Sequence, residues 1–402
     1  MSTQPTQGEN PEVVALLEEA STRADLWDWG ADMEFTEPLR LFVESSHRTG
    51  SLNAVGRDVL HKVVTRHLRN RLAIRAFVKG YPEVEAMPVR RPLFITGLPR
   101  TGTTLLHNLM AADPANRVLR FWQALRVCEP STGAAGCAEE TLVAEAELWL
   151  ERLYALAPYF RAIHPSTATG PEECDALFQN CFASQHFDDM FRADDYSAWL
   201  AGASLRAEYD YYRTQLRALE LQSRARDLDQ GAERRWVLKS PSHLGYLGSL
   251  FDAFPDATVA FCHRDPNEAV GSYASLVLNV RQPYSDDVVP DEVGAHALRR
   301  CTVAMRRALD TRDAVGEERF VDVSYPALVD DPIGVVRGIY ERIGRTLGDA
   351  EQEAMRGWLA DNPRHRHGAH RYGLSQFGLT AETVADGLGA YLDRFGAELT
   401  AR

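Results

Sequence analysis

Residues 92–110 read PLFITGLPRTGTTLLHNLM, and the rest of the chain can be interpreted outward from this segment. Pro92 opens a short apolar run that ends at Gly97, and its length and flanking residues predict a buried parallel strand. A loop rich in glycine and proline follows, after which residues 104–110 predict a helix. A strand, a glycine-bounded loop and a helix in this order are typical of an anion-binding turn in an α/β protein.

The strand signal returns three times further along the chain. Short apolar runs stand at residues 236–238, 258–262 and 320–323, and each precedes a helical segment. Strands that alternate with helices predict an α/β fold, a P-loop-like, doubly wound parallel sheet flanked by helices. Ligands of such sheets bind beyond the carboxyl ends of the strands, so we expect the functional residues there.

Two further regions are predicted to be helical. Residues 13–20 and 58–78 carry apolar side chains at spacings of three and four. We therefore expect residues 1–88 to form a helical region packed on an α/β domain of residues 89–402. Within that domain, residues 138–222 are rich in aromatic side chains and predict a helical insert.

The overall composition limits the possible functions. The chain has 402 residues, 45% hydrophobic and 25% charged, which is ordinary for a soluble protein. Its net charge of −13 argues against a nucleic-acid surface, which needs clustered lysine and arginine. Any anion site is therefore expected to be a local basic pocket in an acidic protein.

The sequence also bears on the cellular location. The polar, acidic N-terminus lacks the pattern of a secretory signal, and no apolar stretch is long enough to predict a membrane span. None of the six cysteines forms a CxxC pair, and six in a chain of this length predict reduced thiols. These features indicate a cytoplasmic protein.

The loop after the first strand has the groups that bind an anion. Backbone N–H groups between Gly97 and Gly102, with the positive end of the following helix, can surround one phosphate. Arg100 adds a full charge. Three hydroxyl groups add donors, those of Thr101, Thr103 and Thr104.

The spacing of this loop is G-x-x-x-x-G, as in a P-loop, but Thr103 follows where a P-loop has lysine. That lysine reaches the β- and γ-phosphates of a nucleoside triphosphate. Without it the loop is poorly suited to cleaving a triphosphate. It is well suited to holding one phosphate and placing a cation beside a group that is transferred.

The run GLPRTGTTLL, residues 97–106, resembles the 5′-phosphosulfate loop of sulfotransferases that use 3′-phosphoadenylyl sulfate (PAPS), in particular a bacterial branch of that superfamily. The resemblance implies PAPS as co-substrate and its desulfated product PAP. It places Arg100 between the 5′-phosphate and the sulfuryl group, and Leu105 where many members stack tryptophan on adenine. The other implied binding residues are Thr101, Gly102, Thr103 and Thr104.

A second anion site is predicted at the end of the strand of residues 258–262. Asp265 and Pro266 mark the start of a helix, with Arg264 just before it and Ser272 two turns into it. An arginine at a strand end with a serine eight positions later resembles the 3′-phosphate site of the same superfamily. The alternative is an arginine that only pairs with a nearby carboxylate.

Two more segments resemble parts of the nucleotide site. Tyr325 follows a strand, as does a tyrosine near adenine in the superfamily. Arg366 and Gly368 resemble its C-terminal basic stretch, which closes on the 3′-phosphate. The rival interpretation of that stretch is a metal site, but its histidines match no known zinc spacing, so no metal is expected. They are His365, His367 and His370.

The catalytic residues are predicted in the segment WVLKSPSHL, residues 236–244. Sulfuryl transfer needs cations on the sulfonate and leaving-group oxygens, and a base for the acceptor hydroxyl. Lys239, with Arg100, suits the first task, and His243 suits the second. Other branches of the superfamily use glutamate as the base, so Glu172 and Glu173 remain alternatives.

The sequence thus predicts a sulfotransferase that moves the sulfuryl group of PAPS to a hydroxyl of a small molecule, lipid or natural product. The insert of residues 138–222 is then expected on the acceptor side. The rival hypotheses are a nucleotide phosphotransferase, which the loop without lysine disfavours, and a catalytically inactive PAP-binding protein. The acceptor and the oligomeric state are not readable from the sequence.

Overall fold

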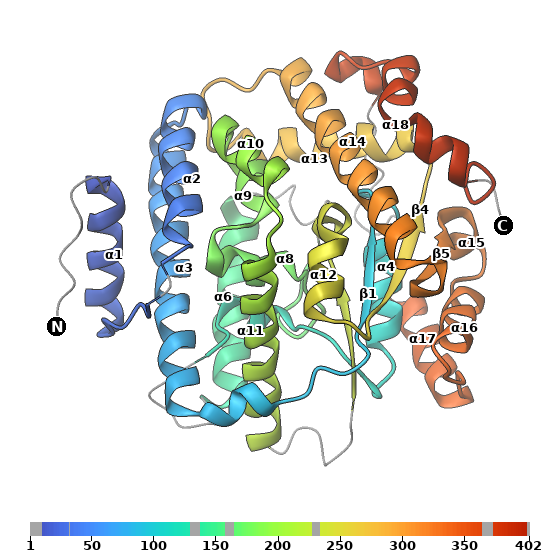
Figure 1. The fold of residues 1–402 in the computed structure, drawn as a ribbon, viewed down its shortest axis with the longest axis horizontal. Coiled ribbons are helices and arrows are strands. Elements are labelled where there is room, and N and C mark those ends of the chain that lie inside the picture. The colour runs from blue at the N-terminus through green and yellow to red at the C-terminus, as the bar shows by residue number, and fades with distance from the viewer. Residues whose placement is uncertain are drawn as a thin grey trace.

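The computed structural model describes residues 10–31, 33–128, 137–156, 165–226, 234–363 and 373–399. Within these ranges a parallel sheet and its helices lie beside a second group of long helices (Figure 1). None of the helices described has both the length and the apolar character that crossing a membrane requires.

The sheet has five strands in the order β2-β3-β1-β4-β5, and every neighbouring pair is parallel. The strands are β1 (Leu93–Gly97), β2 (Asn116–Arg117), β3 (Arg235–Lys239), β4 (Thr258–His263) and β5 (Phe320–Ser324). The four strands expected from the sequence and their parallel arrangement are confirmed. The two-residue strand β2 was not predicted.

Successive strand residues point to opposite sides of the sheet. Both sides are covered by helices, so neighbouring residues of one strand belong to different hydrophobic clusters. Leu93 and Ile95 of β1 belong to one hydrophobic cluster, and Phe94 between them belongs to another. The first cluster includes residues of α4 (Thr103–Ala111), α16 (Pro332–Arg342) and α17 (Asp349–Asp361). The second includes residues of α12 (Leu247–Ala253), α13 (Pro266–Arg281), α14 (Pro290–Val315) and α18 (Ala381–Phe395). The short helix α15 (Tyr325–Asp330) follows β5.

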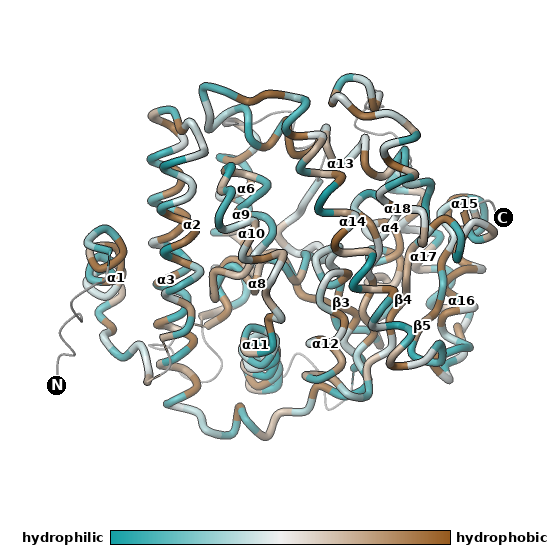
Figure 2. The backbone as a smooth tube through the Cα atoms, turned by 45° about the horizontal axis from the view of Figure 1, so that its top comes forward, coloured by the Kyte–Doolittle hydropathy of each residue, from teal (hydrophilic) through white to brown (hydrophobic). Residues whose placement is uncertain are grey.

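Three helices precede the sheet and confirm the helical prediction for residues 13–20 and 58–78. They are α1 (Pro11–Ala24), α2 (Thr36–Thr49) and α3 (Ala54–Gly80). The side chain of Asn53 caps α3 by accepting from the N–H of Gly56 at 2.8 Å. Hydrophilic and hydrophobic residues alternate along α2 and α3 (Figure 2), as expected when one helix face is buried. Val64 of α3 lies in the same hydrophobic cluster as Phe94 of β1, so these helices share a core with the sheet.

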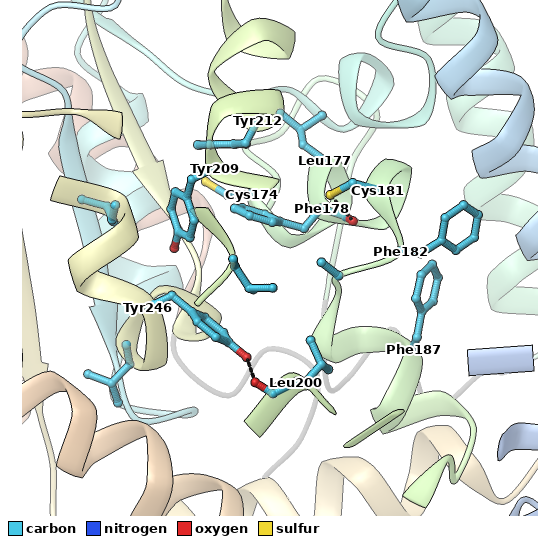
Figure 3. Packing of buried hydrophobic residues seen from close by; sticks show 14 of the residues in the cluster. Cys174, Leu177, Phe178, Cys181, Phe182, Phe187, Leu200, Tyr209, Tyr212 and Tyr246 are labelled. Carbon is cyan, nitrogen blue, oxygen red and sulfur yellow. Dashed lines mark hydrogen bonds between the residues drawn. The ribbon is translucent and has the colours of Figure 1, made fainter. Parts of the chain in front are cut away.

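The predicted insert is helical as well. It contains α6 (Glu139–Leu156), α8 (Asp175–Phe178), α9 (Gln185–Met190), α10 (Asp194–Gly202) and α11 (Arg206–Ala225), and the short α5 (Phe121–Leu125) precedes it. Figure 3 shows Phe178, Tyr209 and Tyr212 packed together. The rings of Phe178 and Tyr212 are stacked with centroids 4.9 Å apart. These aromatic residues therefore form core.

Candidate active site

The loop between β1 and α4 has an unusual backbone. Arg100 and Gly102 both have left-handed conformations, with φ of 71° and 89°. A side chain at Gly102 would place its Cβ 2.9 Å from Cδ2 of Tyr325, so glycine is required there. The buried hydroxyl of Thr101 donates to the carbonyl oxygen of Leu98 at 2.8 Å. Thr101 therefore shapes the loop through its side chain.

Helix α4 begins at Thr103, directly after this loop, and Gly102 at its N-cap has no side chain to accept from the first N–H groups. Such N–H groups with the helix dipole favour a bound anion. The exposed Thr104 lies in the first turn and places its hydroxyl beside them. The geometry of the loop fits a phosphate of a nucleotide.

Lys239 lies at the end of β3, and its buried amine is beside the loop. It donates to Thr104 Oγ1 at 3.4 Å and to the carboxylate of Glu173. The N–H of Cys174 donates to the carbonyl oxygen of Lys239 at 2.9 Å, which fixes the segment of Glu173 against the end of the strand. Lys239 is thus brought to the loop as the sequence suggested, together with Glu173, one of the two alternative bases.

Arg264 and Ser272 meet around Arg100. The Nε of Arg100 donates to Ser272 Oγ at 3.2 Å, and Arg264 Nη1 donates to the carbonyl oxygen of Arg100 at 2.7 Å. Arg264 also lies over the ring of Tyr325, 4.2 Å from its centroid. The helix start expected after Arg264 is present, because Asp265 caps α13 by accepting from the N–H of Asn267.

Arg264 also has the carboxylate partner that the alternative interpretation requires. Its Nη2 lies 2.6 Å from Oε2 of Glu268. The side chain of Glu268 is 57% exposed and that of Arg264 is 17% exposed, so solvent screens the pair on the glutamate side and limits the free energy that it contributes. The pairing therefore leaves Arg264 available to exchange Glu268 for a bound anion.

His243 lies in a different environment from Lys239. Its side chain is buried, and its Nδ1 lies 2.7 Å from the hydroxyl of Tyr209. Its ring packs edge-on against Phe94, with centroids 5.1 Å apart, and near Phe178. Burial lowers the pKa of His243 to about 3. The imidazole is neutral at physiological pH and is absent from the described wall of the cavity.

Glu172 differs from its neighbour Glu173. Its N–H donates to the carbonyl oxygen of Leu119 at 2.8 Å, and its Oε1 accepts from the N–H of Glu173 at 2.8 Å. The carboxylate of Glu172 thus supports the backbone of this turn. Glu173 is the residue of the pair whose carboxylate contacts Lys239.

The site residues surround a cavity with a volume of about 1070 Å³. One part of its wall is the predicted nucleotide side, formed by Arg100, Gly102, Thr103, Thr104, Leu105, Arg264 and Tyr325. The other part comes from α3, α5, α6, α9 and α13. Its apolar side chains include Val55, Val59, Val63, Phe121, Trp149 and Val280, and charged and polar side chains of α3 and α9 lie among them. The cavity therefore joins an anion site to a partly apolar chamber.

Sequence reasoning missed the contribution of α3 to this chamber. Val55, Val59 and Val63 recur every four residues, a spacing that shows a shared face but not what the face contacts. Tyr273, which follows Ser272, also lines the cavity, and its hydroxyl donates to Oδ1 of Asp189 at 2.7 Å.

Two predicted residues, Arg366 and Gly368, lie outside the described residues, as do the three histidines of the rival metal site. Among the residues that are described, no group of three or more potential metal ligands comes together.

These features define a class of protein. A parallel sheet with a P-loop-like turn, cations from two strand ends and a carboxylate on a shared cavity indicate an α/β group-transfer enzyme with an anionic nucleotide substrate. Residues 92–349 match the model of a family described as "Sulfotransferase family". The chain belongs to that family, and it is a sulfotransferase. Membership implies PAPS as co-substrate and PAP as product.

Relatives of this chain include mycobacterial sulfotransferases. It is 26% identical over 337 residues to "Omega-hydroxy-beta-dihydromenaquinone-9 sulfotransferase Stf3" of Mycobacterium bovis, which covers 79% of this chain and 78% of that protein. Among solved structures, sulfotransferase STF1 of Mycobacterium tuberculosis H37Rv matches with a TM-score of 0.81 and 29% identity, covering 94% of this chain and 98% of that one. Sulfotransferase STF9 of Mycobacterium avium matches with a TM-score of 0.79 and 29% identity, covering 99% and 100%.

Proposed function

We propose that this enzyme transfers the sulfuryl group of PAPS to a hydroxyl of an apolar small molecule or lipid, by in-line displacement, with Glu173 as base and without a metal ion. The observation that carries this proposal is the position of Lys239. Its amine contacts both Thr104 of the anion loop and the carboxylate of Glu173. One cation therefore links the donor side of the cavity to a base.

The donor is assigned to the loop and its neighbours. Arg100 and the N–H groups at the start of α4 bind the 5′-phosphate and the sulfuryl oxygens, and Lys239 stabilises the charge that develops there. Arg264 and Ser272 bind the 3′-phosphate, and Leu105 and Tyr325 lie beside adenine. The further binding residues assigned from the sequence are Thr101, Gly102, Thr103, Thr104, Arg366 and Gly368.

Glu173 is preferred to His243 because of where each side chain lies. A general base must reach the proton that it removes. The side chain of Glu173 is 25% exposed and lines the cavity, whereas His243 is 1% exposed and packed among aromatic rings. We assign His243 a positioning role, since its contact with Tyr209 joins the turn after Lys239 to helix α11.

The acceptor class follows from the second half of the cavity. The apolar side chains of its wall suit a hydrophobic or amphiphilic alcohol. The same side chains would leave the polar groups of a sugar without hydrogen-bond partners. The mycobacterial relative named as a menaquinone sulfotransferase supports a lipid acceptor. None of the six cysteines, all of which lie in the described ranges, forms a disulfide, which supports a cytoplasmic location.

The test is a transfer screen with PAPS labelled on its sulfuryl group, across phenols, sterols, hydroxylated lipids and sugars, with and without EDTA. We expect label on an apolar alcohol and equal rates in chelator, because protein cations stabilise the sulfonate. Activity lost in EDTA and restored by Mg²⁺ or Zn²⁺ would disprove the metal-free mechanism. Tight PAP binding without transfer to any acceptor would favour an inactive PAP-binding protein.

A further inference from the structure

Arg66 of helix α3 is a cation in the wall of the cavity, within its apolar half. Its Nε is buried and has no hydrogen-bond partner among the described residues. Its guanidinium carbon lies 5.7 Å from the ring centroid of Trp149 on α6, at the outer limit of a cation–π contact. The side chain therefore lies between two helices that face the chamber.

A network of largely buried hydrogen bonds, through one imidazole and two side-chain amides, holds Arg66 in place. Its Nη2 lies 3.0 Å from Nε2 of His67, whose Nδ1 lies 2.9 Å from Oδ1 of Asn180. Asn180 Nδ2 donates to Oε1 of Gln215 at 2.8 Å, and Gln215 Nε2 donates to the carbonyl oxygen of Leu177.

This hydrogen-bond network fixes the tautomer of His67. Because Asn180 Oδ1 can only accept, Nδ1 of His67 carries the proton, and Nε2 accepts from Arg66. Burial, together with the charge of Arg66, lowers the pKa of His67, so the ring stays neutral. The network orients Arg66 without neutralising its charge.

Three other cations of the cavity wall have carboxylate partners close by. Arg300 pairs with Asp189 at 2.5 Å, Arg264 with Glu268, and Lys62 with Asp58 at 2.7 Å. In the part of the chain that the structure describes, no carboxylate pairs with Arg66. Burial lowers its pKa to about 10, which still leaves it charged at neutral pH. A partly buried guanidinium without a carboxylate partner is costly, which favours a partner that arrives from outside.

We propose that Arg66 binds an anionic oxygen group, in the simplest case a carboxylate, on the acceptor molecule, apart from the hydroxyl that receives the sulfuryl group. The inference deepens the proposed function and rests on it for the identity of the ligand as acceptor. The planar guanidinium, held through one hydrogen of Nη2, still has N–H groups on Nη1 and Nη2 that one carboxylate can accept from. The apolar wall between this group and the anion loop selects a hydrocarbon body, so the acceptor is an amphiphilic hydroxy acid.

A second basic residue supports this assignment. Arg152 lies three residues after Trp149 on α6 and lines the same cavity with an exposed side chain. Positions three apart share a helix face, so Arg152 and Trp149 point to the same side. Two arginines, Arg66 and Arg152, thus line the cavity beside Trp149, which favours binding of an acid over its neutral ester.

The test compares ω-hydroxydodecanoic acid with its methyl ester, which has the same chain and hydroxyl but no charge. Calorimetry measures binding of each to the full-length protein, alone and with PAP. We expect wild type to bind the acid about 10- to 100-fold more tightly than the ester, the usual effect of a charge-assisted hydrogen bond. Arg66→Gln should remove this preference and Arg66→Lys should keep part of it.

Arg69→Gln is the matched control, since Arg69 is an exposed arginine of the same helix outside the cavity wall, and it should keep the full preference. Equal affinity of wild type for acid and ester, or a preference that survives in Arg66→Gln, would overturn the inference. PAP binding and thermal unfolding of each variant show whether it has folded. Failure of wild type to bind PAP would count against the proposed function instead, because the comparison of acid with ester does not need PAP.

Discussion

The two halves of the cavity are built in different ways. The nucleotide side is centred on a continuous loop, Gly97–Thr104, whose backbone and hydroxyls come from neighbouring residues at the end of one strand, and Arg264 and Tyr325 are added from the ends of two others. The acceptor side is assembled from side chains of helices far apart in the sequence, such as Val59 of α3 and Trp149 of α6. Local sequence therefore specifies what the enzyme binds as donor, whereas only the folded chain specifies the acceptor.

If the cavity has a nucleotide side and an acceptor side, the base should lie where the two meet, as Glu173 does. The largest expected effect tests this position. Glu173→Gln should lower kcat by about 10²–10⁴, the usual contribution of a positioned base, because the amide cannot accept the acceptor proton. PAP affinity should change little. Steady-state rates with labelled PAPS and calorimetry with PAP measure the two effects.

Glu172→Gln is the control next in sequence, and it should retain most of the activity because its carboxylate accepts from a backbone N–H. Acidic phenols should depend less on Glu173 than aliphatic alcohols, since they lose their proton more readily. If His243→Asn reproduced the loss in kcat while Glu173→Gln stayed active, the base would be the histidine that the sequence first suggested.

A smaller effect tests whether the nucleotide side acts as one site with two anion positions. PAP carries the 3′-phosphate that AMP lacks, and Arg264 with Ser272 is assigned to it. Arg264→Ala should reduce the preference for PAP over AMP by about 1.5–3 kcal/mol, the value of a hydrogen bond to a charged group. Calorimetry with both nucleotides measures this difference. Arg337→Ala, which removes an exposed arginine of α16, should not change it.

The smallest effect concerns the aromatic core behind the site. The pKa of His243 is about 3 in the folded protein, whereas an unfolded histidine has a pKa of about 6.5. Lowering the pH therefore protonates the unfolded state first and destabilises the fold. Between about pH 7.5 and 5.5 the free energy of unfolding of wild type should fall by about 1.4 kcal/mol more than that of His243→Asn.

Urea denaturation at the two pH values measures this difference. The contributions of the other titratable groups, which both proteins share, cancel when the two free-energy changes are subtracted. An equal fall in the two proteins would mean that His243 is protonated in the folded state. Such a result would bring it back as a candidate for proton transfer.

The parts of the fold with strong local patterns were predictable. The strands near residues 92–97 and 258–262 are short apolar runs followed by helix-start residues, and both lie where expected. Strand β2 has two residues, too few for an alternation to show. Lys239 reached the predicted place because a strand end fixes the position of its side chain.

The environment of His243 was not predictable in the same way. A histidine soon after a strand-end lysine is chemically suited to act as a base, but the 3-10 turn Pro241–Tyr246 directs it toward Phe94 and Tyr209. Arg66 was missed for a related reason. It lies on the same helical face as Val59 and Val63. A single charged residue on an apolar face is normally interpreted as lying at the solvent-exposed border of that face. The Tyr209 and Trp149 contacts come from residues far along the chain.

The strand order also has a consequence for how the protein is made. Strand β1 is fully buried at the centre of the sheet, yet its neighbours are β3 and β4, whose residues Val237 and Thr258 pair with Leu93. At roughly 5–20 residues per second on the ribosome, β1 leaves synthesis on the order of 10 s before either partner exists. During that interval an apolar segment with free edges is exposed to other chains, and its pairing over such long sequence separations is slow. We therefore expect the segment of β1 to be a binding site for chaperones on the nascent chain until β4 has been synthesised.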